Sequence, residues 1–384
     1  MKIALVHDYL SQDGGAEKVL RAFRELWPDA PIFVLFHDRA KLPDFDPELI
    51  RESYLSHLPF VSTKFQWYLP LMPGATERFN LDGFDLVLSS TSAFAKGILT
   101  SPDTLHISYC HSPTRYLWSD THSYVADLPY NRIVKMFLPR LISRLRLWDK
   151  MSADRVDQFI ANSRTVQNRI QKYYRRDSLV IHPPVDFEKF FISKNVGKYF
   201  VAGGRLVPYK NLDLVIRTFN RLRLPLKIFG VGPESARLRK IAKDNIEFLG
   251  KISDEQKAEL FSGAAAFIHP QLEDFGITPL EAMASGRPVI AFAEGGATET
   301  VVPGETGVFF REQTWESLFE AVLHFNSLAW DSEKIREHAG KFRAENFKLA
   351  IRDYVEHHYE EFQKGLHQPQ LLNLTTRPHP TLSL

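Results

Sequence analysis

Short apolar runs rich in Val, Ile and Phe alternate with longer stretches of helical period, and this alternation occurs in two successive series along the chain. The pattern is typical of parallel sheets whose strands are buried on both faces and joined by crossover helices. The first series predicts strands at 2–7, 31–36, 84–89, 106–109 and 158–161. The second series predicts strands at 198–202, 225–229, 246–249, 265–269, 288–291 and 307–310.

Because each series forms a sheet of its own, the sequence predicts an α/β chain with two Rossmann-like domains. A length of 384 residues is too great for one ordinary domain and comfortable for two. We expect an N-terminal domain at 1–183 and a C-terminal domain at 184–345, joined where two consecutive prolines disfavour helix. We further expect a helix at 346–364 and, because 365–384 has three prolines and no clear period, a disordered tail there.

Charge and composition exclude several classes of protein. The formal net charge is only +2, so no overall field favours nucleic acid, and we predict no nucleic-acid partner. The one cysteine, Cys110, allows no internal disulfide, which suits a reducing compartment. No stretch of 18 apolar residues occurs, and the N-terminal apolar run is too short for a signal peptide. We therefore predict a cytoplasmic location.

The most specific motif follows the strand predicted at 265–269, at the edge where open parallel sheets place their ligands. Glu273 and Glu281 are separated there by seven residues that include Gly276 and a predicted helix start. Thr278 is a good N-cap, and a helix N-terminus offers free N–H donors to a diphosphate. The spacing of Thr278 and Glu281 is also that of a capping box, which leaves a structural role open for Glu281. For Glu273 the alternative is a solvated loop charge.

A second motif follows the strand predicted at 198–202. Gly203 and Gly204 let the backbone approach a ligand closely, and Arg205 and Lys210 add two positive charges. An arginine grips phosphate oxygens through two parallel hydrogen bonds, while a lysine acts as a point charge. The motif favours a diphosphate site, with solvated surface cations as the alternative.

Two weaker signals lie in the first half of the chain. Gly14 and Gly15 form a glycine loop before the first helix, without the G-x-G-x-x-G spacing of a dinucleotide site. His111 follows the strand predicted at 106–109, at an edge that we expect to face the second sheet. Loop flexibility would also explain the glycines, and a lone histidine is more often structural, so both alternatives stay open.

Together these segments resemble the retaining GT-B glycosyltransferases of family 4, which include many bacterial mannosyltransferases. The resemblance runs from residue 1 to about 362, and the combination of 203–211 with 273–281 is its most specific part. The opening residues 6–18 and the segment 110–113 are similar to the mannosyltransferases of O-antigen assembly. The resemblance implies the GT-B fold, two Rossmann-like domains facing a central cleft, and a nucleotide-sugar donor, with GDP-mannose favoured over UDP-sugars.

The resemblance also implies a role for each matched residue. Arg205 and Lys210 are expected to hold the donor diphosphate. Glu273 is expected beside the transferred sugar, His111 near its reacting carbon, and Glu281 on the ribose hydroxyls. The other implied donor contacts are glycines and turns, namely Gly14, Gly15 and Gly204 near the phosphates, Gly250, Lys251 and Ile252 at the base, and Phe275, Gly276, Ile277 and Thr278 at sugar and phosphate.

Breaking the anomeric bond leaves negative charge on a nucleoside diphosphate, which cations and helix N–H groups can stabilise. The one D-x-D triplet, Asp44-Phe45-Asp46, lies between prolines, so we predict no metal site and no cofactor. The resemblance implies transfer of a hexose with retention, by front-face attack of the acceptor. A UDP-sugar transferase, a nucleotide-sugar epimerase, a phosphorylase and an inactive nucleotide-sugar-binding scaffold are the alternatives left open.

A basic segment predicts where the acceptor lies. The stretch 132–155 holds seven basic and two acidic residues among many apolar ones. A basic amphipathic helix can lie on an anionic membrane, and the apolar segment 67–72 would add to that surface. We therefore expect a lipid-linked glycan acceptor, cell-surface polysaccharide synthesis and contact with the inner face of the plasma membrane. The alternative is an ordinary helix packed on the first sheet.

Overall fold

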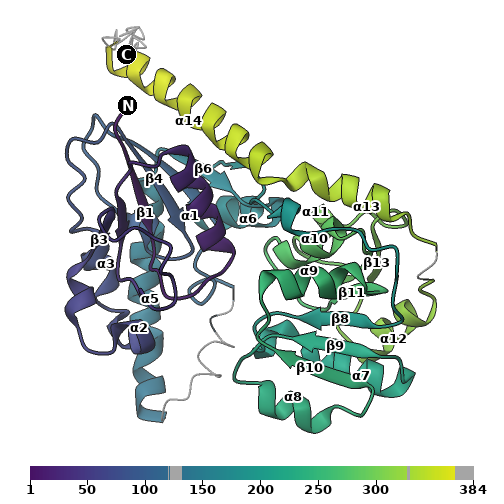
Figure 1. The fold of residues 1–384 in the computed structure, drawn as a ribbon. Coiled ribbons are helices and arrows are strands. Elements are labelled where there is room, and N and C mark those ends of the chain that lie inside the picture. Colours follow the sequence, from purple (N-terminus) through teal and green to yellow (C-terminus); the bar gives the residue numbers. More distant parts are fainter. Residues whose placement is uncertain (120, 122–131, 327–328, 368–384) are drawn as a thin grey trace, which may run out of the picture.

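The computed structural model describes residues 1–119, 121, 132–326 and 329–367, which form two parallel sheets with helices between their strands (Figure 1). Side chains on alternate positions of one strand enter different cores. In the second sheet Phe267 belongs to one core cluster, whereas its neighbours Ala266 and Ile268 belong to another. Both faces of the sheet are therefore covered, as expected for parallel strands.

The first sheet has seven strands in the order β3-β2-β1-β4-β5-β6-β7, and every neighbouring pair is parallel. The three central strands are buried at every position, so their carboxyl ends are fixed by the core. The strands are β1 (Ile3–His7), β2 (Ile32–Val34), β3 (Ile50–Glu52), β4 (Leu86–Thr91), β5 (Leu105–Cys110), β6 (Gln158–Ala161) and β7 (Leu179–Val180).

The second sheet has six strands in the order β10-β9-β8-β11-β12-β13, again all parallel. The strands are β8 (Phe200–Gly203), β9 (Leu226–Phe229), β10 (Ile246–Gly250), β11 (Ala266–His269), β12 (Val289–Phe292) and β13 (Gly307–Phe310). We call the part of the chain with the first sheet the first unit and the part with the second sheet the second unit.

Helices connect the strands in both units. Those of the first unit are α1 (Gly15–Leu26), α2 (Val61–Lys64), α3 (Met72–Thr76), α5 (Arg132–Asp154) and α6 (Arg164–Arg169). Those that follow are α7 (Leu212–Leu222), α8 (Ser235–Ile241), α9 (Asp254–Ser262), α10 (Ile277–Ala284), α11 (Ala297–Thr300), α12 (Trp315–Leu323), α13 (Ser332–Ala339) and α14 (Ala344–His367). None of the described helices is both long enough and apolar enough to span a membrane.

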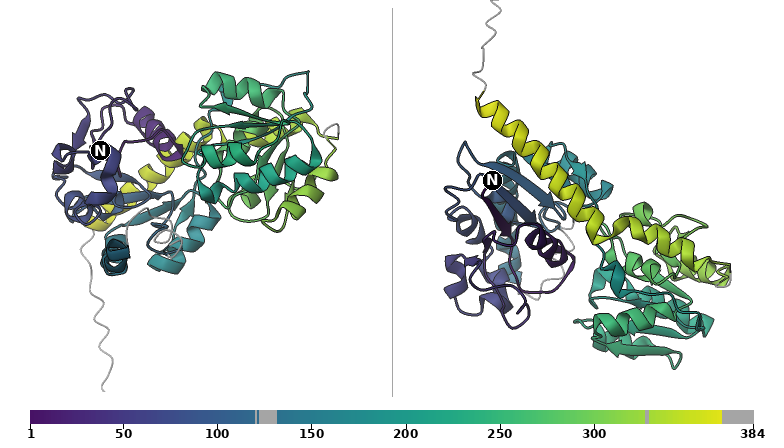
Figure 2. Two further views of the ribbon diagram at one scale, coloured as in Figure 1. Left: turned by 90° about the horizontal axis from the view of Figure 1, so that it is seen from below. Right: turned by 45° about the horizontal axis from the view of Figure 1, so that its top comes forward.

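The last helix, α14, returns from the second unit to the first, as two views show (Figures 1 and 2). Phe347, Ile351 and Val355 recur every four residues, so they lie on one face and are buried in the core of the first unit. Phe347 stacks on Phe23 of α1 with ring centroids 5.9 Å apart. The helix therefore ties the end of the chain to the first sheet.

All eleven predicted strands are present, with ends that differ by no more than two residues. The sequence did not predict β3 and β7, which have three and two residues at the edges of the sheet and lack an apolar run. The helix predicted at 346–364 is α14, which begins at Ala344 and continues to His367. Residues 365–367, predicted as part of the tail, therefore belong to this helix, and 368–384 lie outside the described residues.

The basic segment forms α5, which packs on the first unit through Ile142 and Leu145. The packed alternative is therefore correct for this face of the helix. Leu147 and Met151 lie on an exposed face, with Leu147 64% exposed. The side chains of 132–137 lie outside the described residues, and membrane contact through 132–155 stays a prediction.

Candidate functional site

Side chains from the carboxyl edges of the two sheets contact one another. Lys18, in α1 of the first unit, lies with Nζ 2.9 Å from Oε1 of Glu281 in α10 of the second. Gly15 also lies close to the second unit, because a Cβ atom there would lie only 2.9 Å from Cδ1 of Ile277. The glycine loop at Gly14 and Gly15 is thus adjacent to the predicted turn at 275–278.

Lys210 and Glu273 form the centre of the site in the second unit. They are joined by a hydrogen-bonded ion pair and are both largely shielded from solvent. Burial raises the pKa of Glu273, but the electrostatic attraction of Lys210 and His269 and the hydrogen bonds from Lys210 and Gln271 together outweigh burial and hold this pKa below its ordinary value. A Cβ atom at Gly204 would lie 3.8 Å from Nζ of Lys210, so the glycine leaves room beside the ammonium group. Glu273 is therefore a largely shielded, paired carboxylate, and the solvated-charge alternative is wrong.

Glu281 is buried and held by two lysines. Nζ of Lys18 contacts Oε1, and Nζ of Lys257 in α9 lies 3.0 Å from Oε2. Burial would raise the pKa of Glu281, but these two ammonium groups lower it, so the carboxylate is ionised at neutral pH. An ionised carboxylate can accept hydrogen bonds from a pair of hydroxyl groups.

The predicted helix start at Thr278 is wrong. The helix begins at Ile277, and its N-cap is Gly276, whose φ of 89° lies in the left-handed region that glycine favours. This turn starts the helix two residues earlier than a Thr278 cap would allow. The capping-box alternative for Glu281 is therefore wrong as well, and its carboxylate is directed to the lysines instead.

Arg205 reaches from the second unit toward the first. Its guanidinium donates hydrogen bonds to Oε1 of Gln12, 3.1 Å away, and to the hydroxyl of Tyr209, 3.2 Å away. Lys210 is thus directed to Glu273, while Arg205 extends across to the loop between β1 and α1. The segment after Arg205 forms a 3-10 turn, Pro208–Lys210, and α7 begins only after it.

His111 lies directly after β5, with Nε2 hydrogen bonded to Oγ of Ser90 at 2.8 Å. Burial and the nearby His7 lower the pKa of His111 to about 3, so the ring is neutral at physiological pH. The next residue, Ser112, accepts a hydrogen bond from Arg169, which also forms an ion pair with Asp274 beside Glu273. One arginine thereby links the His111 loop to the Glu273 loop.

Gly250, Lys251 and Ile252 lie where β10 ends, further from the Lys210–Glu273 pair along the sheet. Gly250 has a positive φ of 72°, and no atom lies within 4 Å of the position of a Cβ there. Helix α9 follows directly and carries Lys257 to Glu281. The three residues thus lead into the helix that carries Lys257, and their contact with the base of the donor stays a prediction.

Sequence reasoning missed Lys18, Lys257 and Arg169 as site residues. Lys18 belongs to the glycine-loop motif, but nothing in its local sequence predicts a partner 263 positions away. Arg169 and Lys257 are single basic residues on helices, which are usually solvated. Lys18 and Arg169 find their partners only across the contact between the two units, whereas Lys257 finds Glu281 on the next helix of the second unit.

Among the described residues, no group of three His, Cys, Asp or Glu side chains is placed to hold a metal ion. In the D-x-D triplet, Asp44 accepts a hydrogen bond of 2.7 Å from Arg21. Its side chain is therefore engaged in an ordinary ion pair. Metal independence stays a prediction.

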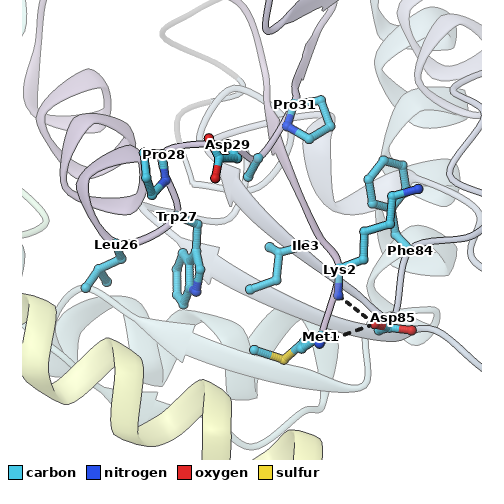
Figure 3. A pocket seen from close by; sticks show the side chains of 11 residues that line it. Met1, Lys2, Ile3, Leu26, Trp27, Pro28, Asp29, Pro31, Phe84 and Asp85 are labelled. Carbon is cyan, nitrogen blue, oxygen red and sulfur yellow. Dashed lines mark hydrogen bonds and ion pairs between the residues drawn. The ribbon is translucent and has the colours of Figure 1, made fainter.

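A pocket of about 520 Å³ lies on the other side of the first unit (Figure 3). Its lining includes Met1, Lys2, Trp27 and Asp85, from the amino end of β1 and the carboxyl end of α1. This is the sheet edge opposite His111, and no predicted site residue lines the pocket. We therefore assign it no part in donor binding.

Two family models match consecutive parts of the chain. Residues 13–189 match "Glycosyltransferase Family 4", and residues 185–342 match "Glycosyl transferases group 1". The two matches meet at the connector between the sheets and together include every site residue described above.

Curated relatives include two mannosyltransferases of O-antigen chains. The O-antigen chain mannosyltransferase RfbU of Salmonella typhimurium is 28% identical over 232 residues, which are 55% of this chain and 65% of the relative. The O-antigen chain mannosyltransferase C of Escherichia coli is 30% identical over 158 residues, 39% of this chain and 42% of that protein. The chain thus spans less than two thirds of the length of either relative.

Solved structures share the arrangement of the whole chain. Sucrose-phosphate synthase from Thermosynechococcus elongatus has a TM-score of 0.72 at 17% identity, covering 94% of this chain and 99% of the other. HepE of Anabaena in complex with UDP has a TM-score of 0.66 at 18% identity, covering 93% and 100%. At such identities the likeness shows a common fold.

Proposed function

We propose that this chain, which belongs to the glycosyltransferases of family 4 and has the GT-B fold, transfers a hexose from a nucleoside diphosphate donor to a glycan. The observation that carries the proposal is the shielded Lys210–Glu273 pair beside the start of α10. A cation, a carboxylate and free helix N–H groups meet there at the carboxyl edge of a parallel sheet, where such sheets bind ligands.

Departure of the nucleoside diphosphate is the step that the site supports best. Negative charge develops on the leaving phosphate, and Lys210, Arg205 and the N–H groups of α10 are preorganised to stabilise it. Glu273 keeps Lys210 in place and, next to the sugar, can accept hydroxyl hydrogen bonds. Such a site needs no metal ion, and we propose that the reaction is metal independent.

Glu281 is the group that we assign to the ribose of the donor. Its ionised carboxylate suits two vicinal hydroxyls, and Lys18 and Lys257 keep it charged although it is buried. Because Glu281 is occupied in this way, it is not the nucleophile of a double displacement. We propose transfer with retention, as the resemblance to the retaining transferases of family 4 implies, by a front-face route in which the acceptor attacks from the face that the diphosphate leaves.

We propose GDP-mannose as the donor and a polysaccharide precursor as the acceptor. Two relatives with O-antigen mannosyltransferase names support this choice of sugar and product. UDP is bound in the HepE structure, so UDP-sugars form the comparison set in any donor assay.

An exposed aromatic patch supports an acceptor anchored in lipid. It consists of Phe60, Trp67 and Leu71, with Lys64 placed over the rings of Phe60 and Trp67 at 5.7 and 4.5 Å. Trp67 is 55% exposed. Aromatic side chains mixed with cations suit the interface of an anionic membrane. We propose that the first unit contacts the inner face of the plasma membrane through this patch and the exposed side of α5.

A donor panel tests the proposal directly. The purified chain is incubated with GDP-mannose and with UDP-sugars, with and without a lipid-linked glycan, and products are separated by mass. Acceptor-dependent mannosylation is expected. Conversion of the donor sugar without an acceptor would identify an epimerase, and binding without any turnover would identify a scaffold.

A further inference from the structure

Beneath His111 lies a line of polar side chains that ends at a carboxylate. Nε2 of His111 is hydrogen bonded to Oγ of Ser90 at 2.8 Å, and the same oxygen is hydrogen bonded to Nδ1 of His7 at 3.1 Å. Nε2 of His7 faces Oε1 of Glu17 at 3.8 Å. Ser90, His7 and Glu17 are almost fully buried, at 0%, 3% and 2% exposure. We call His111, Ser90, His7 and Glu17 the histidine relay.

With both imidazoles neutral and the Ser90 hydroxyl proton donated to one of them, the relay carries its hydrogen bonds in one of two directions. When His7 holds its proton on Nε2, its Nδ1 accepts from Ser90, and Ser90 accepts from Nε2 of His111. When His7 holds its proton on Nδ1, every bond reverses, and His111 carries its proton on Nδ1.

Glu17 selects between the two directions. Its Oε1 is too far from His7 for a hydrogen bond, yet a carboxyl oxygen at 3.8 Å in a buried site attracts the N–H dipole. The ring proton of His7 is therefore favoured on Nε2. The consequence at the other end of the relay is a proton on Nε2 of His111 and a free lone pair on its Nδ1.

We propose that Glu17, through His7 and Ser90, fixes His111 as a hydrogen-bond acceptor at Nδ1, the nitrogen left for a hydroxyl of the donor sugar. Nδ1 makes no hydrogen bond with the described residues, whereas Nε2 is committed to Ser90. The three residues act on the substrate only through His111 and are positioning residues. The sugar contact rests on the proposed function, whereas the tautomer of His111 does not.

Glu17 has a second contact that gives the relay a wider consequence. Its Oε2 accepts a hydrogen bond of 2.9 Å from the backbone N–H of Gly14. The same carboxylate therefore holds the glycine loop and sets the state of His111. In the variant Glu17→Gln, the amide oxygen can keep the Gly14 bond while the NH₂ group faces His7. A donor then replaces an acceptor at the end of the relay, and its direction reverses.

The test is the protonation of both ring nitrogens of His111, read by NMR in the full chain with ¹⁵N-labelled histidine and no ligand. His111→Asn assigns the signals by their loss. In the unmodified chain we expect a protonated Nε2 and an unprotonated Nδ1. In Glu17→Gln the proton should move to Nδ1, and in the Ser90→Ala background Glu17→Gln should no longer move it.

Ser89→Ala is the matched control. Ser89 precedes Ser90 on β4 and makes the same kind of bond, 2.9 Å from Nε2 of buried His106. It should shift the His106 signals and leave His111 unchanged. A proton on Nδ1 of His111 in the unmodified chain would overturn the proposal. So would a His111 tautomer that is the same in Glu17→Gln as in the unmodified chain. The NMR measurement of the tautomer does not require turnover. The relay proposal can therefore be contradicted while the proposed transferase activity stands, and the activity can be contradicted while the relay proposal stands.

Discussion

The Lys18 ammonium of the first unit lies 2.9 Å from the Glu281 carboxylate of the second. Burial alone would lower the pKa of Lys18, but Glu281 and Asp186 raise it above its ordinary value. The pair is therefore ionised at neutral pH. The Glu281 carboxylate, which we assign to the ribose of the donor, therefore also takes part in the contact between the two units.

The first prediction concerns this pair. Lys18→Met keeps the aliphatic stem and removes the charge, so we expect donor affinity to fall by about tenfold, or roughly 1.4 kcal/mol. Calorimetric titration with the donor measures it. In a double-mutant cycle with Glu281→Gln, Lys18→Met should have little further effect. Fully additive losses would show that Lys18 does not act through Glu281.

A second prediction concerns the buried carboxylate that supports the His111 loop. Asp149 accepts hydrogen bonds from Lys96, Thr114 and Trp118 at 2.6, 2.9 and 2.7 Å, and from Tyr174. Asp149→Ala leaves a buried ammonium unpaired, so we expect a loss of about 3–5 kcal/mol in the free energy of unfolding in urea.

The control for Asp149 lies on the same helix. Asp154 is 57% exposed and pairs with Lys150 at 2.6 Å. Asp154→Ala should change the unfolding free energy by no more than about 0.5 kcal/mol, since exposed pairs contribute little. Equal losses in the two variants would contradict the assignment of a supporting role to the buried network.

The third prediction is a dependence of stability on pH. Burial lowers the pKa of His269 to about 4; Glu273 raises this pKa by a smaller amount, and Lys210 lowers it slightly further. The unfolded chain binds this proton with a pKa near 6.5, so folding is favoured above that pH. The contribution is lost as pH falls from about 6.5 to 4 and amounts to roughly 3 kcal/mol.

Urea unfolding at a series of pH values measures this loss. Burial acts in the same direction on His106 and His111, each with a pKa lowered to about 3. Glu273 and Glu281, with lowered pKa values, should add to the loss only in more acidic solution. His269→Gln should reduce the slope of the curve between pH 6.5 and 4 by about one third, because His106 and His111 still contribute. A stability that is already level there in the unmodified chain would be inconsistent with a neutral buried His269.

The fourth prediction concerns the aromatic patch. The double variant Trp67→Ala and Leu71→Ala removes two exposed apolar groups, and we expect binding to anionic vesicles to fall by about tenfold. Co-sedimentation measures it. Leu323→Ala removes an exposed leucine from α12 in the second unit and should have no effect. Co-sedimentation that does not depend on anionic lipid would remove the membrane proposal.

The fold could be predicted closely because its signals are local. Apolar runs and their period define the central strands, and all of them were found. The missed strands, β3 and β7, are short pieces at the sheet edges that form only because a neighbouring strand pairs with them. The helix start at Ile277 was missed because the left-handed turn at Gly276 outweighs the capping preference of Thr278.

The site could be predicted only in part, for a physical reason. Glu273 and Lys210 follow strands of one sheet, so strand order brings them together. Lys18, Arg169 and the histidine relay depend on contacts between distant segments or between the two units. A local sequence pattern cannot predict such contacts, because a single lysine or serine in the sequence is most often an ordinary surface or structural residue.

The central claim is that Lys210 stabilises the departing diphosphate, and the turnover number of Lys210→Ala tests it most directly. Lys240→Ala on exposed α8 is the matched control, because it removes the same charge away from the site. We predict that Lys210→Ala lowers kcat by about 10²–10³-fold, as expected for a lost transition-state contact, while Lys240→Ala does not. An unchanged kcat in Lys210→Ala would contradict the account.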